Sequence, residues 1–386
     1  MSKKTYAVVG SFAMKKGTVK GIHVFGYDPE TGSLEHLQDE KAEINAGQNA
    51  YDSKNHVLYI THESKDRDGE QGGGGKVLAC CLDPETGAVT WLGEKETLGV
   101  QPSYICLTRS GKYMVVPHHG SRDIVTRTVQ KPDGNFEAVT ECDDGAVTLI
   151  RLNDDGTFGE VCDVSVVPPV REGRKLMEIP HLHSCVQSPD GKLLLLCDKG
   201  QDVIHGFHLD EENGKLIPAG KTFVEKDVHP RYGLFHPTVP VFYQNCENSV
   251  YLHVWKYNSD TGELQRIQKI TLLEDEEQAK AWTAECTADF VMTKDSRFLY
   301  VSVRGFNVVS VLEVKEDGAL KLIQVLSCGG KNPRGLCLAP GEKFLFVMNR
   351  DSDLVVPFRR KENGTLEQAG DGVACGLPGN MNFISY

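Results

Sequence analysis

The 386-residue sequence has no long apolar runs. None approaches the roughly 18–20 consecutive apolar residues that a membrane-spanning helix needs. The first residues, MSKKTYAVVGSF, contain no apolar stretch of the length found in secretory signal peptides. We therefore expect a cytoplasmic protein that does not insert into membranes.

The sequence also lacks a surplus of positive charge and any C-x-x-C spacing of its cysteines. Its net charge is −12, which argues against nucleic-acid binding, because nucleic-acid-binding proteins carry a basic face. None of the twelve cysteines forms a C-x-x-C pair, so we expect free thiols rather than disulfides or a zinc knuckle. A small anionic ligand remains compatible, because a few cations can be concentrated in one pocket.

One acidic turn that contains glycine occurs seven times, as in GYDPETGSLEHL and CLDPETGAVTWL. A glycine after Asp, Asn or Thr provides the positive φ angle that a tight hairpin requires. The seven turn glycines are Gly32, Gly87, Gly156, Gly214, Gly262, Gly318 and Gly364. Seven copies of a hairpin indicate a repeat architecture.

Two other segments accompany these turns along the chain. One is a polar turn followed by an apolar strand, as in SPDGKLLLLCDKG, and the other is a short strand before it, as in HPRYGLF and NPRGLCL. Each repeat therefore contains four strands, which is the composition of a propeller blade. The sequence predicts an all-β protein with the fold of a seven-bladed β-propeller.

The two ends of the chain complement each other. The first complete inner strand begins near Gln48, so the strands before it lack an inner partner. The final segment, GLPGNMNFISY, is similar to an inner strand, but the outer strands of its blade do not come after it in the sequence. We predict a single propeller domain over residues 1–386, with the ring closed by pairing of the N-terminal strands with the C-terminal strand. A row of separate sandwiches would not show this complementarity, and closure removes an exposed edge.

Two insertions interrupt the repeats. Residues 65–76 predict a flexible glycine-rich loop, which lacks the G-K-[ST] ending of a phosphate-binding P-loop. Residues 118–145 form a longer insertion, which we expect to lie over one face of the ring and to influence specificity. Residues 273–282 predict one or two helical turns.

Several ionisable residues lie on or beside the predicted inner strands, which converge on the central channel. His181 and His183 are two residues apart and therefore face the same side of a strand. The other candidates are His118, Arg231, Glu247, Arg304, Lys331 and Arg334. Each has a structural alternative, such as a hydrogen-bonded histidine or a turn-capping arginine. Because buried charges without a partner are costly, their convergence favours a site for an anionic small molecule.

The same region resembles a known family. The segments HLHSCVQSPDGKLLLLCDKGQD, HPRYGLFHP, CENSVYLHVWKY, ADFVMTKDSRFLYVSVRG and NPRGLCLAPGEKFLFVMNRDSD are similar to the seven-bladed β-propeller lactonases. That family includes cycloisomerase-type 6-phosphogluconolactonases and the fungal carboxy-cis,cis-muconate lactonizing enzyme. The resemblance covers nearly the whole chain and is strongest from about residue 176 to 355.

The resemblance implies four catalytic positions, His183, Arg231, Glu247 and Arg304. This sequence departs from the family pattern at Tyr232, where many lactonases have histidine. It also has an extra residue, Cys246, before Glu247, and it reads Ser-Val-Arg-Gly around Arg304 where many relatives read Ser-Asn-Arg-Gly.

We expect hydrolysis of a small sugar-acid lactone similar to 6-phosphogluconolactone, in the central channel and without a metal or cofactor. Arg231 and Arg304 would bind the anion and stabilise the oxyanion, and His183, with a pKa near neutrality, would be the general base, oriented by Glu247. His181, His118, Arg334 and Lys331 would be further substrate contacts.

Two alternatives remain open at this point. A cycloisomerase of the carboxymuconate type needs the same cations and one acid or base. A non-catalytic propeller scaffold is the other alternative, although the G-H and W-D signatures of WD-type scaffolds are absent. The natural substrate, the protein partners and the oligomeric state do not follow from the sequence.

Overall fold

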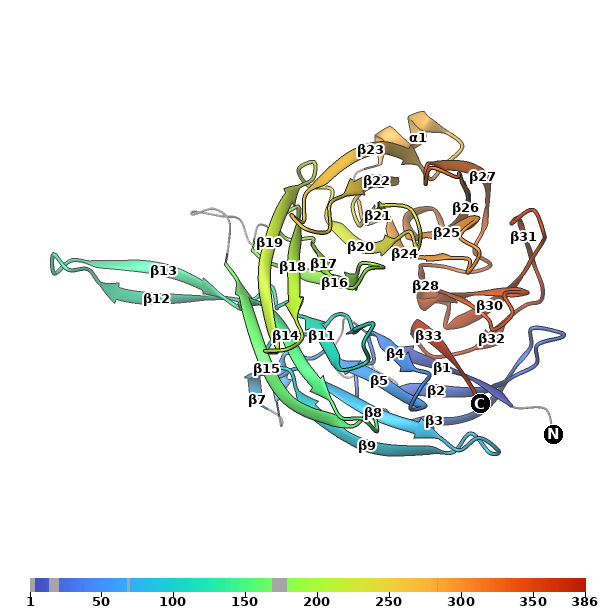
Figure 1. The fold of residues 1–386 in the computed structure, drawn as a ribbon, viewed down its shortest axis with the longest axis horizontal. Coiled ribbons are helices and arrows are strands. Elements are labelled where there is room, and N and C mark those ends of the chain that lie inside the picture. The colour runs from blue at the N-terminus through green and yellow to red at the C-terminus, as the bar shows by residue number, and fades with distance from the viewer. Residues whose placement is uncertain (1–3, 14–20, 68–69, 169–178, 283) are drawn as a thin grey trace.

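The computed structural model describes residues 4–13, 21–67, 70–168, 179–282 and 284–386. Seven small antiparallel sheets surround a common centre, which makes the protein an all-β, seven-bladed propeller (Figure 1). Each blade has four strands in order from the channel outwards, and the sixth has a short additional strand.

The strand bounds of the first four blades follow the chain. Blade 1 contains β4 (Asn49–Asp52), β5 (Val57–His62), β8 (Lys76–Leu82) and β9 (Val89–Glu96). Blade 2 contains β10 (Cys106–Leu107), β11 (Tyr113–Pro117), β14 (Gly145–Leu152) and β15 (Phe158–Val167). Blade 3 contains β16 (Leu182–Gln187), β17 (Leu193–Asp198), β18 (Val203–Asp210) and β19 (Lys215–Phe223). Blade 4 contains β20 (Pro230–Phe235), β21 (Val241–Cys246), β22 (Tyr251–Tyr257) and β23 (Leu264–Thr271).

The last three blades complete the ring. Blade 5 contains β24 (Thr287–Met292), β25 (Phe298–Val303), β26 (Val308–Val314) and β27 (Leu320–Ser327). Blade 6 contains β28 (Pro333–Leu338), β29 (Phe344–Asn349), β30 (Leu354–Arg360), β31 (Leu366–Gln368) and the short β32 (Val373–Ala374). Blade 7 contains β33 (Pro378–Ser385), β1 (Thr5–Ser11), β2 (Ile22–Tyr27) and β3 (Leu34–Glu40).

The predicted ring closure is confirmed. The C-terminal strand β33 is the innermost strand of blade 7 and pairs with β1 in antiparallel register, from Thr5 opposite Ser385 to Gly10 opposite Asn380. Because the first and last segments share a sheet, the ring has no open edge between its ends.

The seven repeated glycines all lie in the turns between the two outer strands of a blade, with φ angles between 64° and 84°. Some of these turns also tie neighbouring blades together. The hydroxyls of Tyr59, Tyr243 and Tyr300 each donate to the carbonyl of a turn glycine in the next blade, at 2.6, 2.8 and 2.9 Å. The repeated turn therefore shapes the hairpin and also anchors a buried tyrosine.

The core lies between the blades. Every residue of β17, β21, β25 and β29 is buried, because each blade is covered on both faces by its neighbours. The largely apolar sequences of these strands, such as LLLLCD, follow from this two-sided burial.

The two insertions differ from the expectation. Residues 124–130 and 136–142 form β12 (Ile124–Gln130) and β13 (Phe136–Cys142), a hairpin that projects away from the ring instead of lying over its face (Figure 1). Its strands pair with each other over their whole length and are largely exposed, so pairing within the hairpin replaces packing on the ring. Residues 65–76 include a short hairpin of β6 (Asp66–Arg67) and β7 (Glu70–Gly73), where a flexible loop was expected.

The helical structure is short. The predicted helical turns are present as α1 (Glu276–Ala281), whose N-terminus is capped by the side chain of Asp275. Two single-turn 3₁₀ helices, η2 (Arg304–Phe306) and η3 (Arg350–Ser352), follow β25 and β29. No helix in the described ranges has both the length and the apolar content to span a bilayer.

Candidate active site

One backbone position is equivalent in all seven blades. A residue at the end of the second strand donates its N–H to the carbonyl of a residue that precedes the innermost strand. For Lys199 and His181 this distance is 3.1 Å, and for Glu247 and His229 it is 2.7 Å. The seven equivalent residues are Phe12, Glu63, His119, Lys199, Glu247, Arg304 and Arg350. All of them therefore lie at the same end of the channel.

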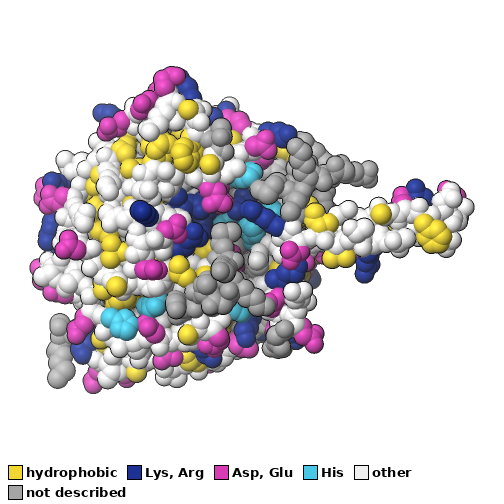
Figure 2. Space-filling view, turned by 180° about the vertical axis from the view of Figure 1, so that it is seen from behind, with side chains coloured by type: hydrophobic (Ala, Val, Ile, Leu, Met, Phe, Trp, Pro, Cys, Tyr) yellow, Lys and Arg dark blue, Asp and Glu magenta, His cyan; other side chains and the backbone are white. Residues whose placement is uncertain are grey.

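A second set of residues reaches this end through β-bulges. The register of the innermost strands shifts between Leu182 and Ser184 in β16, and similar shifts occur near the start of β20, β24 and β28. A bulge turns side chains out of the regular alternation of a strand. The residues within these shifts include His183, Arg231, Tyr232, Asp289 and Arg334. Figure 2 shows lysine, arginine and histidine side chains gathered near the middle of one face of the ring.

The carboxylate of Glu247 is the centre of a buried ion-pair network. Its two oxygens lie 2.8 Å from Nζ of Lys199 and 3.0 Å from Nε of Arg231, and Nη2 of Arg304 is 3.7 Å away. Burial alone would raise the pKa of Glu247, but Lys199, Arg304 and Arg231 together hold it well below its ordinary value. The carboxylate is therefore ionised, and it is the counter-ion of these three cationic side chains.

The two catalytic arginines predicted from the sequence are both brought to this network. Arg231 is almost fully buried, donates to the carbonyl of Ala288, and its guanidinium lies 4.4 Å from the centre of the Tyr232 ring. Arg304 donates to the carbonyl of Thr287 at 2.9 Å, while its Nε is buried without a hydrogen-bond partner. Arg231 is thus held mainly by the protein, whereas Arg304 keeps one unused donor.

His183 lies beside the network, with its ring 5.1 Å from that of Tyr232 in an edge-to-face contact. Its Nδ1 is buried without a hydrogen-bond partner. Burial, together with the positive charges of Arg231 and Lys199, holds the pKa of His183 well below its ordinary value. The expectation of a pKa near neutrality was wrong, because these cations and the loss of water both oppose protonation.

The structure also corrects the assignment of His118 as a substrate contact. Its side chain is fully buried inside the blade, its Nδ1 lies 3.0 Å from the carbonyl of Ala146, and burial lowers its pKa to about 4. The neighbouring His119 takes the channel position, because successive residues of an extended chain point to opposite sides. His119 stacks on His181 at 4.7 Å, and Nδ1 of His181 lies 2.6 Å from the His119 carbonyl, so His181 supports His119.

The two remaining predicted substrate contacts, Lys331 and Arg334, differ in their burial. Lys331 is exposed and its side chain has no ion pair with any described residue, so the structure does not bring it into the network. Arg334 is 9% exposed, and its guanidinium lies 3.7 Å from the centre of the Phe12 ring. Burial and the repulsion of Arg231 lower the pKa of Arg334 to about 9. Among the described residues, nothing forms a hydrogen bond or salt bridge with this guanidinium.

Glu63, which directly follows β5, was not predicted from the sequence. Among the parts of the chain that the structure describes, no side-chain hydrogen bond or ion pair reaches its carboxylate. A Cβ atom on Gly47 would lie 2.0 Å from Oε2 of Glu63, so this glycine leaves the space that the carboxylate occupies. Burial raises the pKa of Glu63 to about 7, against the opposing effect of Arg334 and Arg231. Comparing residues after the second strands, Glu63 in ITHES and Lys199 in LCDKG, would have found both.

Asp289 is a second carboxylate missed from the sequence. Its Oδ2 accepts a hydrogen bond from the backbone N–H of Leu336 at 2.9 Å and its Oδ1 accepts one from Phe290. Burial raises its pKa to about 6 despite these hydrogen bonds. The two backbone donors fix its orientation beside Arg231 and Arg334, which both favour its ionised form.

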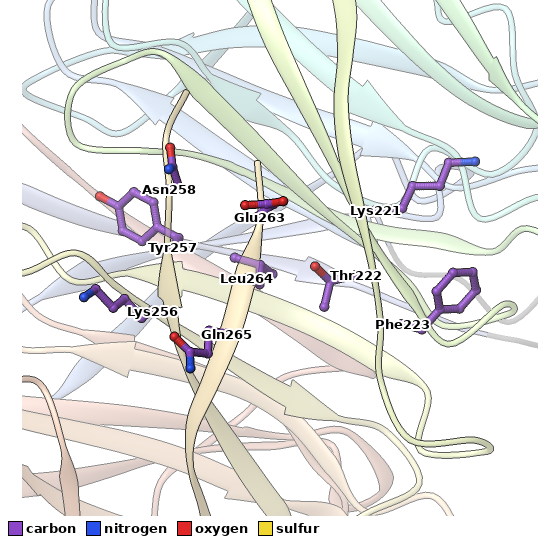
Figure 3. Close-up of a pocket in the computed structure, with 9 residues that line it drawn as sticks. All are labelled: Lys221, Thr222, Phe223, Lys256, Tyr257, Asn258, Glu263, Leu264 and Gln265. Atoms are coloured by element: carbon purple, nitrogen blue, oxygen red, sulfur yellow. The ribbon is translucent and has the colours of Figure 1, made fainter. Parts of the chain in front are cut away.

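The cavity shown in Figure 3 and the one group of three potential metal ligands among the described residues both lie away from the ion-pair network. No set of three metal-ligating side chains within the described ranges includes a residue of this channel end. A cavity of about 560 Å³ lies instead between the outer strands of blades 3 and 4, lined by residues of β19, β22 and β23 and their turn (Figure 3).

Comparison with known proteins covers almost the whole chain. A 6-phosphogluconolactonase of Bacillus subtilis (strain 168) is 25% identical over 384 residues, which is 99% of each chain. A 6-phosphogluconolactonase of Formosa agariphila is 26% identical over 98% of this chain and 99% of its own.

Solved structures show the same fold. The periplasmic gluconolactonase PpgL of Pseudomonas aeruginosa has a TM-score of 0.82 at 22% identity and matches 99% of both chains. A protein from Lactobacillus plantarum has a TM-score of 0.79 at 22% identity, over 98% of this chain and 99% of that one. Residues 6–383 match the family described as Lactonase, 7-bladed beta-propeller. The chain therefore belongs to the lactonase family of seven-bladed β-propellers.

Proposed function

We propose that the protein hydrolyses a small, anionic sugar-acid lactone, such as 6-phosphogluconolactone, at the charged end of its channel. The names of the Bacillus and Formosa relatives support this class of substrate. The location of the site rests mainly on Arg334, a buried arginine whose guanidinium forms no hydrogen bond or salt bridge with the described residues.

Arg334 is suited to bind the carboxylate or phosphate of such a substrate. A buried cation without a partner is unfavourable, and an anion that enters the channel removes that cost. An arginine binds planar or tetrahedral oxyanions through two parallel N–H donors. We therefore assign the anion-binding role to Arg334 rather than to Arg231, whose donors already face Glu247 and Ala288.

Glu63 is the general base in this proposal. Its carboxylate has no hydrogen-bonded partner among the described residues, and its pKa of about 7 is matched to neutral conditions. Glu63 removes a proton from water as the water oxygen attacks the ring carbonyl. When the carbonyl carbon–ring oxygen bond breaks, the same proton is returned to the leaving alkoxide, which yields the open-chain acid.

The developing oxyanion needs a donor, and Arg304 and His183 have unused polar atoms at this channel end. Nε of Arg304 and Nδ1 of His183 are buried without partners. With its lowered pKa, His183 is neutral near pH 7 and can donate from only one ring nitrogen. We assign oxyanion stabilisation to Arg304 with His183 beside it, and we assign a positioning role to Glu247 because it holds Lys199 and Arg231.

We propose that this chemistry proceeds without a metal in the channel. Four cationic side chains, Lys199, Arg231, Arg304 and Arg334, surround this end and disfavour a divalent cation. The substrate assignment and the independence from metal are both tested by measuring proton release from freshly prepared 6-phosphogluconolactone at neutral pH, with a chelator present.

A matched control sharpens this assay. Arg359 is an exposed arginine of β30, so Arg359→Gln is the matched control for Arg334→Gln. We expect a chelator-resistant rate well above buffer that is reduced in Arg334→Gln and unchanged in Arg359→Gln. A wild-type rate equal to that of buffer would overturn the substrate assignment, and carboxymuconate cyclisation would then be assayed.

A further inference from the structure

A second cluster of polar side chains lies away from the channel, on the two outer strands of blade 7. Nδ1 of His23, on β2, is 2.6 Å from Oδ1 of Asp39, on β3, and Nε2 of His36, also on β3, is 2.7 Å from the same oxygen. The ligand atoms of the three side chains all lie within 4.8 Å of one another. Outside the masked positions, this is the one group of three potential metal ligands in the chain.

A β-bulge builds this cluster. Residues three apart in a regular strand, such as His36 and Asp39, face opposite sides. Here His23 pairs with Asp39 and Phe25 pairs with His36, so the strand β3 contains one extra residue between the two pairs. The extra residue reverses the alternation and turns both β3 side chains to the side of His23.

The same bulge carries different residues in another blade. In blade 4 the equivalent pairs are His253 with Lys269 and Trp255 with Arg266. Two of those four side chains are cationic, and they pair with the carboxylate of Glu225. The backbone device is therefore shared, and only blade 7 places two imidazoles around one carboxylate.

The arrangement of donors and acceptors offers a place for a cation. Nε2 of His23 lies 3.3 Å from the carbonyl oxygen of Gly376, which can only accept, so this contact is a hydrogen bond in the tautomer that has its hydrogen on Nε2. In a neutral imidazole Nδ1 then has a lone pair, and it faces a carboxylate oxygen that is also an acceptor. Two acceptors 2.6 Å apart are held together by a second proton. A metal ion that takes the place of this proton sets its ligand atoms slightly further apart, because its bonds to nitrogen and oxygen are about 2.0–2.1 Å long.

We propose that His23, His36 and Asp39 bind a divalent transition metal that prefers imidazole and carboxylate ligands, with Zn²⁺ as the representative ion. The carbonyl of Gly376 then has the second-sphere role that is common for metal-bound histidine, since it fixes the ring orientation. The side chains of His36 and Asp39 are 46% and 54% exposed, so the ion is reachable and keeps positions for water.

The location gives this ion a structural consequence. Gly376 lies two residues before β33, the strand that closes the ring. A metal bound by His23 and by two residues of β3 therefore links the outer hairpin of blade 7 to the segment that leads into the closing strand. Because it binds the folded state, the metal stabilises this closure.

The test uses the full-length chain without a histidine tag. Co²⁺ is titrated while its d–d absorption is recorded, and Zn²⁺ is titrated by calorimetry. The variants are His36→Ala and Asp39→Asn, whose side chains are exposed and leave the fold intact, and the matched control is Glu35→Gln on the same strand.

We expect one ion per chain in the wild type and in Glu35→Gln, and a loss of affinity of at least about tenfold in both ligand variants. We also expect Zn²⁺ to raise the melting temperature of the wild type but not of His36→Ala. Absence of Co²⁺ binding at millimolar concentrations would overturn the site, as would equal binding in all four proteins. Binding without a change in melting temperature would overturn the link to ring closure.

Discussion

Charged side chains occupy the same backbone positions on the two sides of the channel end, but their ion pairing differs between the two sides. On the side of blades 3 to 5, Lys199, Arg231 and Glu247 form ion pairs within 3.0 Å. On the side of blades 6, 7 and 1, Arg334 and Glu63 have no such pair with any described residue. The difference separates a framework, whose charges are compensated by the protein, from groups whose charges remain available to a ligand.

The pKa directions follow this division. Lys199, Arg304 and Arg231 hold the pKa of Glu247 well below its ordinary value against the effect of burial. Burial instead raises the pKa of Glu63 to about 7 and lowers that of Arg334 to about 9, because nearby opposite charge compensates only part of the lost hydration. Groups that are only partly compensated in this way are the ones we expect to exchange protons or bind anions.

The largest expected effect is on the chemical step. Glu63→Gln keeps the shape of the side chain but removes the base, so we expect kcat for lactone hydrolysis to fall by about 10²–10⁴-fold. The melting temperature should remain near that of the wild type. Steady-state proton release checks this, with Glu43→Gln as an exposed control. An unchanged kcat would remove Glu63 from the mechanism and return the role of base to His183.

The next largest effect is expected on stability, at the ion pairs on the side of blades 3 to 5. Glu247→Gln leaves Lys199 and Arg231 buried without a counter-charge, and the loss of one partner from such a pair costs about 3–5 kcal/mol of folding free energy. The midpoint of denaturant unfolding should therefore fall clearly, whereas Glu212→Gln, at an exposed turn, should leave it unchanged. A Glu247→Gln protein of wild-type stability would show that the network contributes little to the folded state.

The pH dependence gives a smaller but sharper test. Because Glu63 must be ionised, kcat/KM should rise about tenfold per pH unit below its pKa of about 7. Because Arg334 must be charged, kcat/KM should fall above about pH 9. The profile is measured with the spontaneous hydrolysis subtracted. A lower limb that persists in Glu63→Gln would assign that limb to another group.

The smallest effect is expected at the projecting hairpin. Replacing residues 124–142 by a short glycine-serine linker should leave kcat and KM unchanged, because β12 and β13 pair with each other and project away from the ring. Steady-state kinetics on the shortened chain check this. An increase in KM would show that the hairpin takes part in substrate recognition after all.

The sequence predicted the fold well because the fold depends on local patterns. The seven turn glycines and the unpaired inner strand at the C-terminus were sufficient to predict blades and closure. The same motifs brought His183, Arg231, Glu247, Arg304 and Arg334 to one end of the channel. Lys331 was predicted there too, but its side chain remains exposed.

The properties of these residues could not be predicted in the same way. Whether Arg231 is compensated and Arg334 is not depends on neighbours from other blades. Whether His118 or His119 faces the channel depends on a shift of one residue at the end of β11. No sequence motif marks Glu63. The pKa of His183 depends on two cations that lie 16 and 48 residues away in sequence, Lys199 and Arg231.

The most direct test of the account compares two arginines at the same end of the channel. KM for 6-phosphogluconolactone and the melting temperature are measured for Arg334→Gln and Arg231→Gln side by side. The account predicts that Arg334→Gln raises KM by about tenfold or more, as expected for a lost charge-assisted hydrogen bond, with little change in melting temperature. It predicts that the main effect of Arg231→Gln is a lower melting temperature. The reverse pattern, with Arg231 controlling KM and Arg334 controlling stability, would contradict the division of the channel into a framework and a binding side.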